Sequence, residues 1–229
     1  MQLNADFSQR VAVHAGELAW VASPIAGVDR RMLDRIGGEV ARATSIVRYA
    51  PNSRFAAHTH DGGEEFLVLD GVFSDEHGDF PAGSYVRNPP TSRHTPGSAP
   101  GCTIFVKLWQ FAADDRTEVQ VDTTAMRFDR DRDRPEREVL ELFQDAREHV
   151  RLERWQPDSE ISLAVPGGLE LLVLSGGFVE GGETFKPQSW LRLPAGGRLR
   201  ATAAASGCTL WAKSGHLATA PSAPPPQRG

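Results

Sequence analysis

The stretch HTHDGGEEF, residues 58–66, combines residue types that bind metal ions at a spacing that can bring them together. Successive side chains of a β-strand point to opposite faces, so His58 and His60 would share one face. After the two glycines the chain can return as a second strand, in which Glu64 and Glu65 face opposite ways. One of the two glutamates can therefore join the histidines. Imidazoles and carboxylates are typical ligands of divalent transition metals.

The first half of the chain recurs in the second half. The segment RYAPNS (48–53) returns as RWQPDS (154–159), and GGEEFLVLDG (62–71) returns as GGLELLVLSG (167–176). The segment GCTIFVK returns as GCTLWAK, and the copies lie 105 or 106 residues apart. Such self-similarity indicates an internal repeat. The two copies can therefore be compared position by position.

Four polar positions of the first copy are aliphatic in the second. Those positions are His58, His60, Glu64 and His94, which align with Leu163, Val165, Leu169 and Leu199. A joint replacement is expected if the four side chains converge on one interior point, because an unpartnered buried imidazole or carboxylate is costly. We therefore predict that the four residues bind one divalent transition-metal ion per chain. The donor types suit zinc, iron, manganese, nickel or copper.

Residues that both copies retain are interpreted as structural. They are the pairs Lys107 and Lys213, Arg48 and Arg154, Arg87 and Arg192, Glu65 and Glu170, and Cys102 and Cys208. Tyr85 and Trp109 are candidates for the wall of a pocket. Tyr85 aligns with Trp190 in the second copy, which favours a role in the core instead. No residue beyond the four ligands can be assigned as a general base, so the catalytic residues stay unknown.

The distribution of apolar residues favours an all-β protein with two barrels. Short apolar runs alternate with Pro and Gly, and helical periodicity is confined to residues 31–36 and 139–147. The predicted organisation is an N-terminal strand or arm (1–27), a metal-binding barrel (28–111), a charged linker (112–134), a degenerate barrel (135–217) and a disordered tail (218–229). The alternating run VAVHAGELAWVA in the N-terminal arm could add an edge strand to either barrel.

Two motifs of the first copy resemble those of the cupin superfamily. The run HTHDGGE, with Gly71 seven residues after Glu64, is followed by PAGSYVRNPPTSRH. The resemblance implies two tandem jelly-roll (cupin) barrels, a bicupin whose second barrel lacks a metal site, and it implies the same ligands, His58, His60, Glu64 and His94. Asn52 departs from the motif, which usually has Gly at that place in a turn.

The segments SIVRYAPNSRFAAHTHDGGEEFLVLDG and GCTIFVKL resemble the ChrR cupin-like family most closely. The family is named for the C-terminal domain of an anti-sigma factor that binds zinc and responds to singlet oxygen, so the resemblance favours zinc over iron, manganese or nickel. In that factor a separate N-terminal helical zinc domain inhibits the sigma factor. This chain has no cysteine before Cys102. We therefore expect no tight sigma-factor binding.

Three functions are compatible with these observations. The first is a metal-binding regulatory or sensor protein related to the cupin part of the anti-sigma factor. The second is a metal-dependent dioxygenase that acts on small diketones or hydroxyketones, a class that the resemblance also implies. The third is a small-molecule-binding barrel in which the metal is structural.

Composition and charge limit the classes of partner and the cellular compartment that we expect for this protein. The net charge is -5, and no segment collects Lys and Arg without matching acids, which argues against nucleic acid. The N-terminus lacks the features of a signal peptide and no apolar run could span a membrane, so we expect a cytoplasmic protein. The two cysteines are expected to be free thiols. A homodimer and a small-molecule ligand are both compatible with the sequence.

Overall fold

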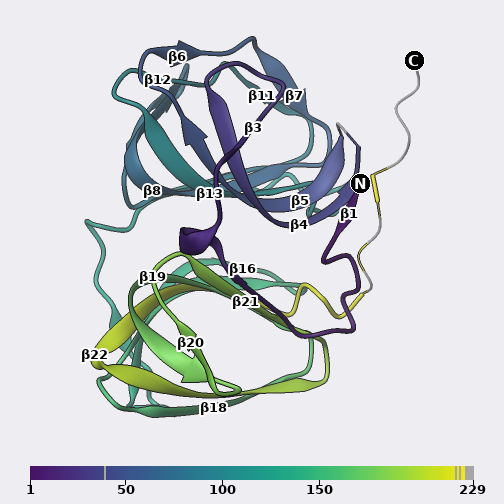
Figure 1. Ribbon diagram of the computed structural model, residues 1–229. Helices are drawn as coiled ribbons and strands as arrows, with labels where there is room; N and C mark the ends of the chain where they lie inside the picture. Colours follow the sequence, from purple (N-terminus) through teal and green to yellow (C-terminus); the bar gives the residue numbers. More distant parts are fainter. Residues whose placement is uncertain (39, 220, 222, 225–229) are drawn as a thin grey trace. The chain divides into compact units, whose positions relative to one another are not determined.

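The computed structural model describes residues 1–38, 40–219, 221 and 223–224. Strands dominate this part of the chain, and the helix assigned within it is the short 3-10 helix η1 (Ala15–Glu17) (Figure 1). The prediction of an all-β protein is thus confirmed. Contacts divide the described chain into two compact units, one built on residues 1–5 and 19–125 and the other on residues 6–18 and 126–219.

The first unit is a curved antiparallel barrel. Its main sheet has the strand order β1-β4-β5-β13-β8-β10-β14, and β7 and β11 form a separate two-stranded ladder. Its strands are β1 (Gln2–Leu3), β3 (Val21–Ala22), β4 (Val28–Gly37), β5 (Ala41–Tyr49), β6 (Ser53–Arg54), β7 (His58–His60), β8 (Glu64–Asp75), β9 (Gly78–Pro81), β10 (Ser84–Asn88), β11 (Ser92–His94), β12 (Gly97–Ser98), β13 (Cys102–Leu108) and β14 (Val119–Asp122).

The second unit repeats this plan, with one continuous strand in place of three short ones. Its sheet has the order β15-β16-β17-β22-β19-β21-β2, and β18 pairs with β22. The long β22 corresponds to the three separate strands β11, β12 and β13 of the first unit. Its strands are β2 (Val11–His14), β15 (Asp129–Arg130), β16 (Arg137–Gln144), β17 (His149–Trp155), β18 (Glu160–Val165), β19 (Leu169–Glu180), β20 (Glu183–Phe185), β21 (Ser189–Leu193) and β22 (Gly197–Ser214).

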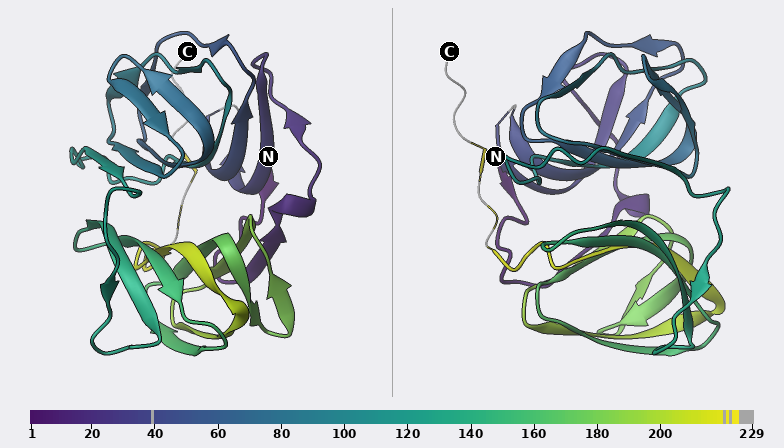
Figure 2. Two further views of the ribbon diagram at one scale, coloured as in Figure 1. Left: turned by 90° about the vertical axis from the view of Figure 1, so that its left-hand side faces the viewer. Right: turned by 180° about the vertical axis from the view of Figure 1, so that it is seen from behind.

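The N-terminal segment contributes strands to both units. Strands β1 and β3 pair with β4 of the first unit, whereas β2 pairs with β21 of the second. The charged segment after the first barrel also forms strands, because β14 pairs with β10 and β15 pairs with β16. Figure 2 shows these edge strands from two further sides. The edge strand predicted for either barrel is therefore realised in each of them by a different piece of chain.

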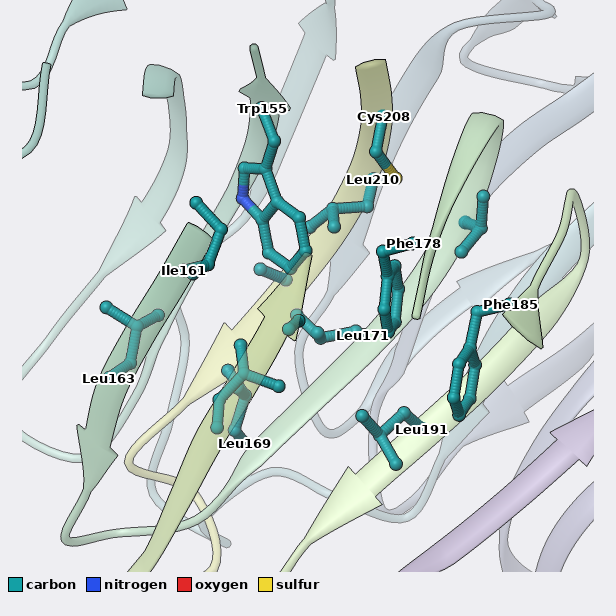
Figure 3. Packing of buried hydrophobic residues seen from close by; sticks show 14 of the residues in the cluster. Trp155, Ile161, Leu163, Leu169, Leu171, Phe178, Phe185, Leu191, Cys208 and Leu210 are labelled. Atoms are coloured by element: carbon teal, nitrogen blue, oxygen red, sulfur yellow. The ribbon is translucent and has the colours of Figure 1, made fainter. Parts of the chain in front are cut away.

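Each unit has its own apolar core. In the first, Phe66, Phe73 and Phe80 pack with Ile104 and Val106. In the second, Trp155, Phe178 and Phe185 pack among aliphatic side chains, and the rings of Phe178 and Phe185 stack with centroids 4.6 Å apart (Figure 3). Both cysteines are buried free thiols, and burial raises the pKa of Cys102 to about 11.

The weak helical patterns at residues 31–36 and 139–147 do not form helices. Strand β4 runs from Val28 to Gly37 and β16 from Arg137 to Gln144. Each strand contains a register shift, between Met32 and Asp34 in β4 and at the aligned place in β16. Such a bulge inserts one residue and breaks the period of two. The helical periodicity of these two stretches therefore reflects the bulges and not a helix.

The tail predicted to be disordered, residues 218–229, lies largely outside the described residues, and the part within them forms no strand. Among the described residues, no helix has the length and apolarity needed to cross a bilayer.

Candidate metal centre

The two histidine-bearing strands pair with each other. In the β7–β11 ladder His58 is opposite His94, and His60 is opposite Ser92. A tight turn then leads into β8, where Glu64 is the first residue. The turn needs glycine, because a Cβ on Gly62 would lie 2.2 Å from the ring of Trp109. The segment HTHDGGE thereby brings the predicted donors to one place.

The three predicted histidines lie close together, and Glu64 lies beside two of them. One nitrogen from each of His58, His60 and His94 lies within 4.8 Å of the others. The Nε2 atoms of His60 and His94 are 2.9 Å apart, and Glu64 Oε2 lies 3.3 Å from the first and 3.6 Å from the second. Ligand atoms bound about 2.1 Å from one ion lie about 3 Å from one another. These distances fit a shared ion.

Neighbouring groups orient the donors toward the shared point. Nδ1 of His94 lies 3.1 Å from Asp75 Oδ2, and Nδ1 of His58 lies 3.1 Å from the carbonyl oxygen of Ala56. A proton on each Nδ1 satisfies these acceptors and leaves the Nε2 lone pair for a cation. Asn88 Nδ2 donates to Glu64 Oε2 at 3.2 Å and fixes the carboxylate.

Burial and charge shift the histidines in opposite directions. Burial lowers the pKa of His60, and the neighbouring histidines lower it further against the effect of Glu64. Burial also acts to lower the pKa of His94, but the hydrogen bond to Asp75 and the charge of Glu64 outweigh it, so the pKa of His94 ends above its ordinary value. The carboxylates therefore favour a positive charge at this place, which a metal ion can supply.

The cluster lies in the wall of a large cavity. The cavity has a volume of about 720 Å³, and His58, His60 and Glu64 line it. Small side chains of β5, such as Ala43 and Ser45, form part of the wall and leave the interior open. A molecule of substrate size could therefore reach the donors directly.

Some lining residues were predicted and others were missed. Trp109, one of the two candidates for a pocket wall, lines the cavity. Tyr85 is fully buried and donates from its hydroxyl to Glu65 at 3.0 Å, which agrees with the core role. Tyr49 lines the cavity and Asp75 supports His94, and neither role follows from the sequence. An Asp or Tyr on a strand carries no local signal that separates these roles from ordinary packing.

The second unit has the same ladder without the donors. Leu163 is opposite Leu199 in the β18–β22 pairing, as His58 is opposite His94. The positions aligned with the four ligands are Leu163, Val165, Leu169 and Leu199, all within the buried core cluster. The register therefore supports the repeat alignment independently of the sequence match.

A charge cluster occupies the interior of the second unit. Glu153 accepts from Arg137 Nη1 at 2.9 Å, from Arg151 Nε at 2.6 Å and from Trp155 Nε1 at 2.7 Å. Strand pairing aligns Arg137, Arg151 and Glu153 with Val28, Ser45 and Val47, which line the first cavity. A smaller cavity of about 360 Å³ is left beside the two arginines.

The turn that departs from the motif adopts the conformation that glycine would. Asn52 has a φ of 59°, and the aligned Asp158 has a φ of 55°. Asn and Asp tolerate this left-handed region better than other residues with a side chain. The substitution in the motif thus changes no ligand.

Comparison with a sequence family confirms the resemblance. The model of the family described as ChrR Cupin-like domain matches residues 8–112, which include the whole donor cluster. Among curated proteins, no match to the chain is found.

Solved structures share the fold of most of the chain. A candidate dioxygenase from Nostoc punctiforme has a TM-score of 0.76 at 15% identity, over 96% of this chain and 88% of that one. The protein Ylba from Escherichia coli has a TM-score of 0.69 at 14% identity, over 93% of each chain. The pirin YhhW from Escherichia coli, solved in complex with nickel(II), has a TM-score of 0.64 at 13% identity, over 90% of this chain and 98% of that one. At these identities the likeness concerns the fold alone.

Proposed function

Because residues 8–112 match the family model described as ChrR Cupin-like domain and the chain has a cupin fold, we propose that the first barrel is a metal-dependent oxygenase for small organic molecules. The ligands are His58, His60, Glu64 and His94. One observation carries the proposal: three of the four donors, His58, His60 and Glu64, form part of the wall of a cavity of about 720 Å³. A metal site that only stabilised the fold would not need such a chamber. A bound divalent transition metal supplies Lewis acidity and, for iron or manganese, redox capacity.

The residues of the chain prepare this chemistry in three ways. Three imidazoles and one carboxylate hold the ion and leave its charge positive. Burial raises the pKa of Tyr49, and the charge of Glu64 adds to the effect, so the phenol keeps its proton. Tyr49 lines the cavity and can donate a hydrogen bond to an oxygen of a bound molecule. The apolar side chains of β13 keep water from the organic part of that molecule.

The solved neighbours support this choice. One is a candidate dioxygenase and another binds nickel(II). A third, from Pseudoaminobacter salicylatoxidans, is a salicylate 1,2-dioxygenase solved as an adduct with gentisate, with a TM-score of 0.56. These properties belong to those proteins, and they show that the fold can house oxygen chemistry.

The test begins with protein purified without an affinity metal. After its metal content is measured, the chain is loaded with Fe(II), Mn(II), Ni(II) or Zn(II) and dioxygen uptake is followed with a panel of small diketones, hydroxyketones and aromatic acids. We expect metal-dependent uptake with at least one compound. Glu64→Gln should change turnover more than folding, because it alters the charge at nearly constant shape. A loaded protein that consumes no dioxygen with any compound would reject the oxygenase.

The family match favours a second candidate, a regulatory or sensor protein. In that case the same residues bind zinc, and the cavity binds a small effector without turning it over. Stoichiometric zinc in the purified protein and effector binding without oxygen uptake are the results that this function requires. Tight co-purification with a sigma factor would extend it to direct transcriptional control, which we do not expect.

A further inference from the structure

The charged side chains that line the cavity are mostly cationic. Among the described residues they are Arg30, Arg35 and Arg54 against the single carboxylate of Glu64, which belongs to the donor cluster. The histidines add no negative charge, and a divalent ion would add positive charge. The net positive charge of the cavity wall therefore favours the binding of an anion.

A bulge in β4 sets two of the arginines on one wall. Arg30 lies before the register shift between Met32 and Asp34, and Arg35 lies after it. In a regular strand, residues five positions apart face opposite ways. The extra residue reverses the alternation, so both side chains line the cavity.

The second barrel keeps the bulge and lacks arginines at these three positions, although Arg137 and Arg151 lie elsewhere in its interior. Strand pairing aligns Arg30 with Val139, and Arg35 with Gln144. The sequence repeat aligns Arg54 with Glu160. The three arginines are therefore absent from the copy that also lacks the metal donors. The bulge itself does not require the arginines, because β16 of the second barrel forms the same bulge without them.

The guanidinium groups of Arg30 and Arg54 have N–H groups that no carboxylate of the described chain accepts from. Arg30 Nη2 donates to Ser23 Oγ, and within the described part of the chain no carboxylate pairs with Arg30 or Arg54. Arg54 is solvent-exposed, whereas Arg30 is partly buried. The guanidinium of Arg30 and the carboxylate of Glu64 both influence the pKa of Tyr49. Arg30, Tyr49 and Glu64 thus belong to one electrostatic neighbourhood.

The rest of the wall is apolar. Val28, Val47, Ile104, Val106 and Leu108 line the same chamber. An inorganic anion would leave these side chains in contact with water, whereas an organic acid would cover them. A guanidinium also matches a carboxylate with two parallel hydrogen bonds.

From these observations we propose that the cavity selects small organic carboxylates, with Arg30 and Arg54 binding the carboxylate and the apolar wall binding the body of the molecule. The proposal names the substrate class of the centre proposed above and rests on it. Arg30 and Arg54 are specificity-determining residues here, because they bind the part of the molecule that does not react.

The test compares three acids with their uncharged amides: benzoate with benzamide, phenylacetate with phenylacetamide, and 3-phenylpropionate with 3-phenylpropionamide. Calorimetry measures binding to the zinc-loaded and to the chelator-treated chain, and elemental analysis gives the metal content of each sample. We expect at least one acid to bind about tenfold or more tightly than its amide. Because carboxylates also bind metal ions, the preference has to persist in the metal-free chain to count as support.

Variants assign the preference to the arginines. In Arg30→Gln with Arg54→Gln, the acid and the amide should bind within about threefold of each other while metal content stays unchanged. Arg48→Gln is the matched control, because Arg48 is exposed, pairs with Asp29 at 2.7 Å and does not line the cavity. Equal binding of all three acids and amides, or an acid preference that survives in the double variant, overturns the proposal. A chain that binds no metal yet prefers acids rejects the metal centre and retains the anion site.

Discussion

His58 is paired with His94 across the β7–β11 ladder, at the place where the second unit pairs Leu163 with Leu199. Backbone register thus sets two donors opposite each other before any ion arrives. The same backbone accepts two leucines, so the fold does not depend on the imidazoles. Side chains at these positions can therefore be changed to test metal binding without dismantling the barrel.

Removal of one donor should remove the ion. We expect His58→Ala and His94→Ala to reduce bound metal at least tenfold, because each removes one of four ligands from the cluster. Elemental analysis of protein purified without an affinity metal measures this. His77→Ala is the control, since His77 is exposed and lies outside the cluster. Full metal content in both donor variants contradicts the assignment.

Asp75 should tune metal affinity without touching the ion. Its carboxylate lies 3.1 Å from Nδ1 of His94 and is nearly buried. We expect Asp75→Asn to weaken metal binding about 10- to 100-fold, because the partner that orients His94 and increases its basicity is weakened. Competition with a coloured chelator gives the affinity. Asp79→Asn should leave it unchanged, since Asp79 instead accepts from Ser74 Oγ at 2.6 Å.

The second unit should lose stability in acid through Glu153. Burial acts to raise the pKa of Glu153, but the charges of Arg151 and Arg137 outweigh burial and lower it. A carboxyl whose pKa is lower in the folded state contributes its stability above the unfolded pKa of about 4.3, and loses it as pH falls through the folded value. Urea unfolding of the full chain between pH 7 and pH 3 should show this loss.

Glu153→Gln separates this effect from general acid unfolding. The variant leaves two arginines without their buried partner, so we expect a loss of about 3–5 kcal/mol at pH 7 and a flatter pH dependence below pH 4.5. Glu141→Gln is the control, because the Glu141 side chain is 60% exposed and should change stability by less than about 0.5 kcal/mol. An unchanged pH slope in Glu153→Gln would show that other carboxyls dominate.

Metal removal should lower the melting temperature and leave the fold intact. Both units have apolar cores that do not include the donor cluster. Binding to the native state alone stabilises by about 4 kcal/mol when free metal exceeds Kd a thousandfold. Chelator-treated protein should therefore keep its β-sheet circular dichroism, with hydrogen exchange increasing in the first unit only. Equal loss of protection in both units contradicts this expectation.

The donor cluster could be predicted from the sequence because the two copies of the internal repeat can be compared with each other. His58, His60, Glu64 and His94 change together between the copies, and a metal site is the simplest reason for such a joint change. The supporting residues gave no such signal. Asp75 aligns with Glu180, another acid, so its contact with His94 depended on three-dimensional proximity that spacing alone does not give.

The bulges explain why β4 and β16 were difficult to predict. One inserted residue joins two runs of period two out of phase, and the apolar residues then recur at three and four positions, as in a helix. Arg35 faces the cavity for the same reason, so the side of the sheet that it occupies could not be read from alternation. The edge strands β2 and β14 were also beyond prediction in detail, because pairing partners far apart in sequence are set by tertiary packing.

The buried Arg137, Arg151 and Glu153 also limit how the two barrels could be exchanged. Writing His, His, Glu and His into Leu163, Val165, Leu169 and Leu199 would restore the donors in their original register. The transplanted centre would face a smaller chamber, of about 360 Å³ instead of about 720 Å³, because three charged side chains occupy the volume that Val28, Ser45 and Val47 leave open in the first barrel. Such a chimera would offer a reactant about half the volume, with buried charges beside the ion. Two equivalent centres in this chain would therefore require smaller side chains in place of Arg137, Arg151 and Glu153, in addition to the four metal donors.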